Sequence, residues 1–336
     1  MKIPTNADSS DSVTADDRAE FIITELLAVH AGEQVAIVLD PASEMEMAWA
    51  LAHASKRVGA EYTLLTIPAR DTDRKNNLTQ VVERGLESAD VLIGLTGTCG
   101  APTYAASVKA LYRAKRLRGM SMVMRTMENF TSGGALADYA ALKREGDQLA
   151  ALWRQASRIR VTTPAGTDFE STISGEEVVI ECGYATEPGL EAAFSDGEVS
   201  QMPNEGKATG TIVVDGPIAH LGIGEVPLSV VVESGLVVEV LGDDGRAQRL
   251  REIVSTIPFA DNVAEVGIGL NPACRRNGDF EEEKKARGYV HIAIGDNVFY
   301  GGTVESPVHM DMVMYAPTVW LDDRVVVDAG EVQGFG

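Results

Sequence analysis

The sequence predicts an α/β fold in two parts: an N-terminal Rossmann-like domain with a parallel sheet over residues 1–157, and a β-rich α+β domain over residues 158–336. In the first part, helical spacing of apolar residues alternates with short, mostly apolar strands, which is typical of a parallel sheet covered by helices on both faces. After Arg158 the apolar residues come in short runs between Gly, Pro and Asp, which indicates strands joined by turns. A chain of 336 residues also exceeds the usual size of one compact core, which favours two domains that share a cleft.

The expected elements follow one another in a regular order. Thr14 can cap a first helix that ends near His30. Further helices are expected over residues 47–54, 78–86, 102–117 and 135–156, and strands over residues 34–40, 61–67, 90–97 and 121–126. In the second part, strands are expected within residues 158–163, 210–216, 227–242 and 324–332, and the one clear helix over residues 247–254.

The charge and the cysteines exclude several classes of function. The formal net charge is -21, so the protein would repel phosphate backbones and anionic lipid, and we expect neither nucleic acid nor a membrane as a partner. No apolar run approaches the ~20 residues of a membrane span, and the N-terminus lacks the pattern of a signal peptide. Cys99, Cys182 and Cys274 are far apart, which fits reduced thiols. We therefore expect a cytoplasmic enzyme that acts on a small molecule.

The candidate chemistry begins with the histidines. His309 and Asp311 lie in an extended stretch whose side chains alternate, so both point to the same side. An imidazole beside a carboxylate suits a divalent cation, although a hydrogen-bonded pair that only stabilises a strand is the alternative. His291 precedes His309 by eighteen residues, on a second strand of the same kind, and this favours the cation. His220, in a Gly-rich turn, stays undecided.

Two glutamates complete the candidate set. Glu265 stands in AEVGIGLNP, where Gly267 and Gly269 permit a close approach of the backbone. Glu205 stands in QMPNEGKATG, just before a valine-rich strand. Either glutamate alone is typical of a solvated loop, so their interest lies in the combination with the histidines.

In order and approximate spacing, these residues resemble the metal site of the aminopeptidase T family of metalloaminopeptidases, from about residue 31 to the C-terminus. The resemblance implies a homodimeric hydrolase that cleaves an amide or peptide bond of a small substrate or short peptide with a water activated by two divalent ions, zinc, cobalt or manganese. It implies that Glu205 and Tyr300 manage protons as catalytic residues. The implied metal ligands are Glu205, Glu265, His291, His309 and Asp311.

Two alternatives stay open. In AGTDF, GYATEPG and MPNEG the chain is also similar to the 2,5-dihydroxypyridine dioxygenases, which implies ring cleavage with one Fe(II). The carboxylate-rich set of ligands favours a dinuclear site, so hydrolysis is the main expectation and ring cleavage the alternative. The other alternative places a binding site or a reactive thiol at Cys99, where LTGTCGAPTY opens a helix after a strand.

Overall fold

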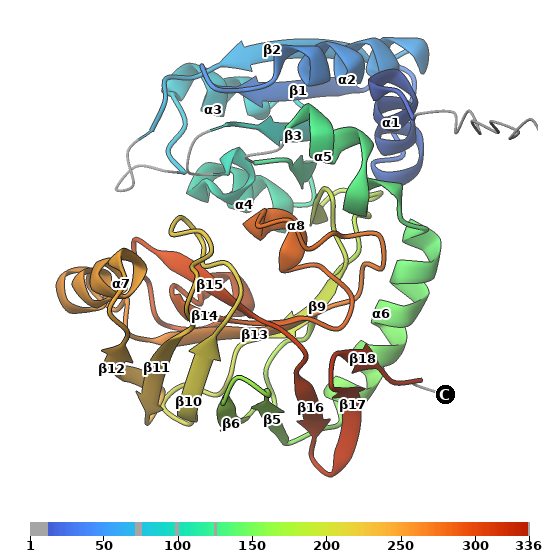
Figure 1. Cartoon of the computed structure of the whole chain (residues 1–336). Helices are drawn as coiled ribbons and strands as arrows, with labels where there is room; N and C mark the ends of the chain where they lie inside the picture. Colours follow the sequence, from blue (N-terminus) through green and yellow to red (C-terminus); the bar gives the residue numbers. More distant parts are fainter. Residues whose placement is uncertain (1–12, 71–75, 98–100, 124–125, 335–336) are drawn as a thin grey trace, which may run out of the picture.

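The computed structural model describes residues 13–70, 76–97, 101–123 and 126–334, and these ranges form three sheets (Figure 1). The first sheet is wholly parallel, with strand order β2-β1-β3-β4-β8. Its strands are β1 (Gln34–Leu39), β2 (Glu61–Thr66), β3 (Val91–Leu95), β4 (Arg118–Ser121) and β8 (Glu191–Ala193). The expected parallel sheet is therefore present.

Helices cover both faces of this sheet, as the sequence predicted. Ala36 and Val38 of β1 belong to an apolar cluster with α3 and α4, whereas Ile37 belongs to the main core with α1 and α2. The helices of the N-terminal part are α1 (Ala15–Phe21), which a π-helical turn (Ile22–Leu26) extends, α2 (Met45–Arg57), α3 (Gln80–Leu86), α4 (Ala106–Arg113), α5 (Met127–Thr131) and α6 (Tyr139–Trp153). Of these, α6 packs against strands Val179–Glu181 and Glu198–Gln201, which lie outside this sheet. Two 3-10 turns, Pro102–Tyr104 and Gly133–Leu136, precede α4 and α6.

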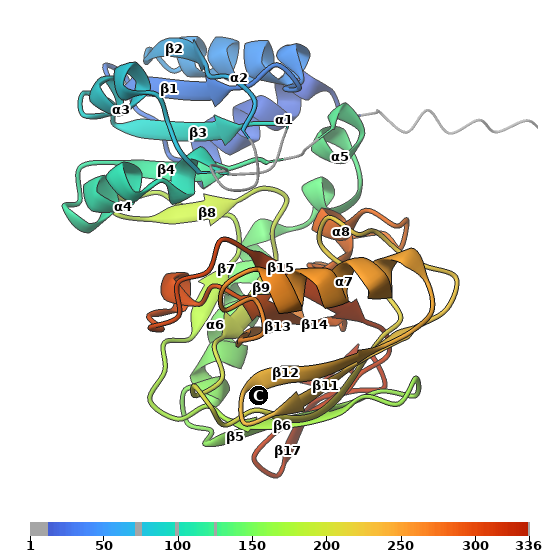
Figure 2. The ribbon, with the colours of Figure 1, turned by 90° about the vertical axis from the view of Figure 1, so that its left-hand side faces the viewer.

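Two strands of the first sheet differ from the expectation, β4 in its position and β8 in its origin. The strand expected over residues 121–126 lies instead at Arg118–Ser121 and includes a charged residue that is 2% exposed. Beyond it, the chain returns from the second part to add β8 to the edge of the sheet (Figure 2). Residues 191–193, which the sequence assigned to the second domain, are thus part of the first sheet.

The second part consists of two antiparallel sheets. One has the order β12-β11-β10-β6-β5-β16-β17-β18 and the other β15-β14-β13-β9-β7. The strands are β5 (Arg158–Thr162), β6 (Asp168–Thr172), β7 (Val179–Glu181), β9 (Glu198–Gln201), β10 (Thr209–Val214), β11 (Leu228–Glu233), β12 (Leu236–Leu241), β13 (Val263–Gly269), β14 (Val290–Gly295), β15 (His309–Met314), β16 (Thr318–Leu321), β17 (Arg324–Asp328) and β18 (Glu331–Val332). The helices are α7 (Gly245–Thr256) and α8 (Phe280–Glu283), with a 3-10 turn at Val298–Tyr300.

The five-stranded antiparallel sheet is the layer that positions the site. It lies between the N-terminal helices and the eight-stranded sheet (Figure 1). Val266 and Ile268 of β13 join the main apolar core, so Glu265 and Gly267, which alternate with them, point to the opposite face. Among the described helices, none combines the length and the apolar character that a membrane span requires.

Candidate metal centre and active-site cavity

The polar face of the five-stranded sheet places small residues between large polar ones. Glu265 and Asp311 both pair with Ala293, which lies on the strand between them. His291 pairs with Gly267 on β13. A Cβ on this glycine would lie 2.2 Å from His291 Cε1, so the missing side chain is the space that the imidazole occupies. These small residues let three strands bring their polar side chains to one point.

Glu265 is the centre of this cluster. Its Oε1 lies 3.0 Å from His291 Nε2 and its Oε2 lies 2.9 Å from His309 Nε2. His309 Nε2 is also 3.3 Å from Asp311 Oδ1. The four predicted ligands Glu265, His291, His309 and Asp311 are thus brought together by the structure.

The tautomer of His309 favours a cation between its Nε2 atom and the carboxylates of Glu265 and Asp311. Its Nδ1 lies 2.7 Å from the carbonyl oxygen of Asp296, and because a carbonyl only accepts, Nδ1 must carry the hydrogen. In the neutral ring, Nε2 would then turn a lone pair toward the carboxylates of Glu265 and Asp311, which is unfavourable without a cation between them. A backbone carbonyl that fixes the imidazole in this way is the usual support of a metal-ligating histidine.

Glu198 joins the cluster although the sequence analysis did not select it. Its Oε2 is 3.5 Å from His291 Nε2, and the side chain is 2% exposed. Among the described residues, no donor forms a hydrogen bond to Glu198 Oε2 or to Asp311 Oδ1. The ligand atoms form two groups, Glu198–Glu265–His291 and Glu265–His309–Asp311. Within each group these atoms lie within 4.8 Å of one another, so that either group could hold a metal ion.

The electrostatics of the cluster favour a bound cation. Burial alone would lower the pKa of His291, but the carboxylates of Glu198 and Glu265 outweigh burial and raise it to about 9. Burial is likewise outweighed at His309, where Asp311 and Glu265 raise the pKa well above its usual value. A metal ion can replace these protons, because it satisfies the same carboxylates. The residues present therefore fit a metal centre.

Glu205 does not lie with the other predicted ligands. It is exposed, and its oxygens accept hydrogen bonds from Thr303 N, Thr303 Oγ1 and Asn297 Nδ2 at 2.7, 2.7 and 3.0 Å. The bonds from Thr303 are the main cause of its lowered pKa. Glu205 therefore holds the loop between β14 and β15 in place, and its predicted role as ligand and catalyst has no support in its position.

Two consecutive lysines hold the carboxylates of the cluster. Lys284 Nζ is 3.2 Å from Asp311 Oδ2, and Lys285 Nζ is 2.7 Å from Glu198 Oε1. Lys285, 2% exposed, also contacts Asp196 at 2.9 Å and Glu181 at 3.3 Å. Carboxyl groups still outnumber the ammonium groups, so the cluster keeps an excess of negative charge that suits a dication.

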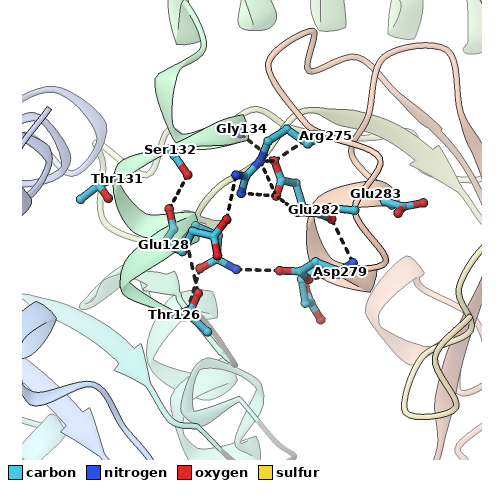
Figure 3. Close-up of polar contacts among 12 residues, drawn as sticks. Thr126, Glu128, Thr131, Ser132, Gly134, Arg275, Asp279, Glu282 and Glu283 are labelled. Atoms are coloured by element: carbon cyan, nitrogen blue, oxygen red, sulfur yellow. Dashed lines mark hydrogen bonds and ion pairs between the residues drawn. The ribbon is translucent and has the colours of Figure 1, made fainter. Parts of the chain in front are cut away.

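A polar network fixes α8, the helix that directly precedes these lysines. Arg275 binds both oxygens of Glu282, with Nε 3.0 Å from Oε1 and Nη2 2.9 Å from Oε2, and its Nη1 reaches Glu128 Oε1 at 2.9 Å (Figure 3). Asn129 donates to Asp279 at 2.8 Å. Since Glu128 and Asn129 belong to α5, this network ties α8 to the N-terminal part of the chain (Figure 3).

The cluster opens onto a cavity of about 510 Å³ that both parts of the chain line. Tyr300 lines it, and its ring stacks on His309 with 6.3 Å between centroids and 27° between planes. Ser200 Oγ donates to the Tyr300 hydroxyl at 3.3 Å. His220 also lines the cavity. Cys99, the centre of the alternative thiol site, lies outside the described residues.

A model of the family described as NicX, 2,5-dihydroxypyridine 5,6-dioxygenase, matches residues 22–334. The chain belongs to this family. Another match to this dioxygenase family is the 2,5-dihydroxypyridine 5,6-dioxygenase of Pseudomonas putida KT2440, 28% identical over 202 residues. That alignment covers 54% of this chain and 55% of the relative, so the chain spans about half the length of the curated relative it matches.

Two solved structures share the fold of this NicX-family chain. The structure of the Pseudomonas putida KT2440 dihydroxypyridine dioxygenase has a TM-score of 0.82 and 23% identity, with 95% of this chain and 96% of the other covered. Wild-type AmpT from Thermus thermophilus has a TM-score of 0.65 and 16% identity, with 95% and 98% covered.

The family match corrects the main expectation from the sequence. The assignment to the aminopeptidase T family and the hydrolase function were wrong, and the dioxygenase alternative is the one supported. The shared fold explains the error, because AmpT and the Pseudomonas putida dioxygenase both fold like this chain, and a shared fold does not by itself distinguish one function from the other. The homodimer stays a prediction.

Proposed function

We propose that this chain is a ring-cleaving dioxygenase that acts on a dihydroxylated nitrogen heterocycle of the 2,5-dihydroxypyridine type. The family match supports the class of reaction. The observation that carries the proposal is the cluster around Glu265, whose two oxygens each face the Nε2 atom of a histidine at the end of a cavity.

The residues that would hold the metal are Glu265, His291, His309 and Asp311, with Glu198 beside His291. Two imidazoles with carboxylates suit Fe(II). When bound, iron supplies the redox chemistry that lets dioxygen react with an aromatic ring, which no side chain of the cluster provides alone. The alternative of two zinc, cobalt or manganese ions is replaced here by one Fe(II).

The chain's own residues would bind and orient the ring. Tyr300, stacked on His309, and Phe299, 4.9 Å from Tyr300 between centroids at 90°, present two aromatic surfaces to the cavity. A flat heterocycle can pack against such surfaces while its hydroxyl groups face the cluster. The hydroxyl group of Tyr300 stays the candidate for moving a proton near the reacting ring.

Three measurements test this function. We expect protein loaded anaerobically with Fe(II) to retain about one iron per chain, to consume one O2 per 2,5-dihydroxypyridine, and to place both oxygen atoms in the ring-opened product. His309→Ala should lose bound iron and oxygen uptake together, since it removes an imidazole from the cluster. His53→Ala is the matched control, because His53 is exposed on α2. Iron-loaded protein that takes up no oxygen, or that releases amines from aminoacyl amides, would contradict the proposal.

A further inference from the structure

The end of the cavity that α4 forms carries positive charge. Lys109 and Arg113, four residues apart on α4, both line the cavity. Their position is unusual for a chain of net charge -21, in which basic side chains are scarce. Lys284 and Lys285 also line the cavity, but carboxylates of the cluster hold them.

Lys109 is held in place by aromatic rings. Its Nζ lies 5.2 Å from the ring centroid of Tyr104 and 5.3 Å from that of Phe299, and these two rings are 5.8 Å apart. Contacts of this kind fix a cation without neutralising it. Since Phe299 contacts Tyr300 and Tyr300 stacks on His309, one continuous series of rings joins Lys109 to the metal cluster.

The charges of Lys109 and Arg113 are not balanced within the described part of the chain. There, neither side chain forms an ion pair with a carboxylate, although Glu281 and Glu305 also line the cavity. Glu191 acts on Lys109 from a distance, but burial raises the pKa of Glu191 to about 7, so a share of it is uncharged at neutral pH. An anion in the cavity would therefore meet an incompletely compensated positive charge.

We infer that Lys109, assisted by Arg113, binds a carboxylate substituent of the substrate, so that the preferred substrate is a dihydroxypyridine that carries a carboxylate on its ring. The heterocycle lies along the rings of Phe299 and Tyr300, its hydroxyl groups face the cluster, and its carboxylate reaches α4. Charge-assisted hydrogen bonds of this kind discriminate strongly against a neutral group of the same shape. The identity of the ring rests on the proposed function, whereas the preference for an anion does not.

The test compares each acid with its amide, which has nearly the same shape and no charge. Anaerobic calorimetric titrations would use 2,5-dihydroxypyridine with a carboxylate at ring position 3 or 4, each beside the matching carboxamide. We expect one carboxylate to bind wild-type protein about tenfold more tightly than its amide, the size of one charge-assisted hydrogen bond. Lys109→Met should reduce the ratio of the affinities for acid and amide to near one. Arg113→Met should reduce this ratio less, and Lys109→Arg should keep part of the preference for the acid.

Lys56→Met is the control for the change in total charge, because Lys56 is exposed on α2 and does not line the cavity. It should leave the ratio unchanged. Equal affinities for both acids and their amides in wild-type protein, or a preference that Lys109→Met leaves intact, would overturn the inference. If Lys109→Met does not fold, loss of the whole preference in a folded Lys109→Arg variant would also overturn it.

The two proposals fail separately. A clear preference for the acid without oxygen uptake on any of these rings would overturn the ring-cleaving function and leave the anion site standing. Oxygen uptake with equal affinities for acid and amide would do the reverse.

Discussion

Gly267→Ala is the sharpest perturbation that the structure offers, because it adds one methyl group at a known distance. The new Cβ would lie 2.2 Å from Cε1 and 2.3 Å from Nε2 of His291. Ordinary contacts between such atoms are at least about 3.4 Å, so the imidazole must move by roughly 1 Å or the strands must separate. His291 is fully buried, so the ring has little space in which to move.

The displacement has two measurable consequences. Overpacking of this kind costs about 1–3 kcal/mol of unfolding free energy, which denaturant unfolding of the metal-free protein measures. A ligand that is misplaced by more than about 0.5 Å no longer completes a metal site, so we expect the affinity for Fe(II) to fall by roughly tenfold to a hundredfold. Competition with a chromophoric chelator measures this affinity.

Gly85→Ala is the matched control. Gly85 lies in α3, and a Cβ there would meet nothing within 4 Å, so the same substitution should leave iron binding unchanged and stabilise the protein by about 0.5–1 kcal/mol. Gly267→Ala with wild-type affinity for iron would refute the reasoning, because His291 could then not be a ligand that depends on this space.

Three further changes test polar contacts to which the structure gives a role in stability and none in iron binding. Glu205→Gln should lower the free energy of unfolding by about 1–2 kcal/mol, because it weakens the hydrogen bonds from Thr303, and it should leave the iron content unchanged. A loss of iron would contradict the placement of Glu205 outside the metal cluster. Glu33→Gln should cost about 2 kcal/mol at neutral pH, because it leaves the buried Arg118 without its carboxylate at 2.7 Å. Burial would raise the pKa of Glu33, but the ion pair with Arg118 outweighs burial and lowers it. The difference in unfolding free energy between wild type and variant is therefore fully present above pH 4.5 and should vanish as the pH falls through the lowered pKa. A difference that persists in acid would refute this role of Glu33. Arg275→Met should lower the free energy of unfolding by about 3 kcal/mol, because it leaves the buried carboxylate of Glu282 without its cation; thermal or chemical unfolding measures this. Unchanged stability would show that the network with α5 is not needed.

The sequence revealed those parts of the fold that depend on local periodicity. Apolar runs located β1 and β3 well, because buried parallel strands are apolar along nearly their whole length, and the partly exposed edge strand β2 was also located. The same reasoning misplaced β4, since it started the strand at Ser121 and left Arg118 outside it. Arg118 can be buried because its guanidinium group donates hydrogen bonds to Glu33 and to the backbone carbonyls of residues 27 and 28. These acceptors lie about 90 residues earlier in the chain, so local sequence does not reveal them.

The site was only partly visible for a similar reason. Alternation along a strand placed His309 and Asp311 on one face, and four predicted ligands do converge. Glu198 was missed because its nearness to His291 depends on the pairing of β9 with β13. Glu205, seven residues later, was chosen instead on the resemblance of MPNEG to a known motif. Only the register of the sheet distinguishes the two glutamates.

Crystals of the protein grown with Fe(II) under anaerobic conditions, with diffraction recorded at the iron absorption edge, test the central claim most directly. We predict one strong anomalous peak at the polar face of the five-stranded sheet, bound by Glu265, His291, His309 and Asp311, with Glu198 beside His291. A peak at Glu205 or elsewhere, or no peak in iron-loaded crystals, would contradict the account.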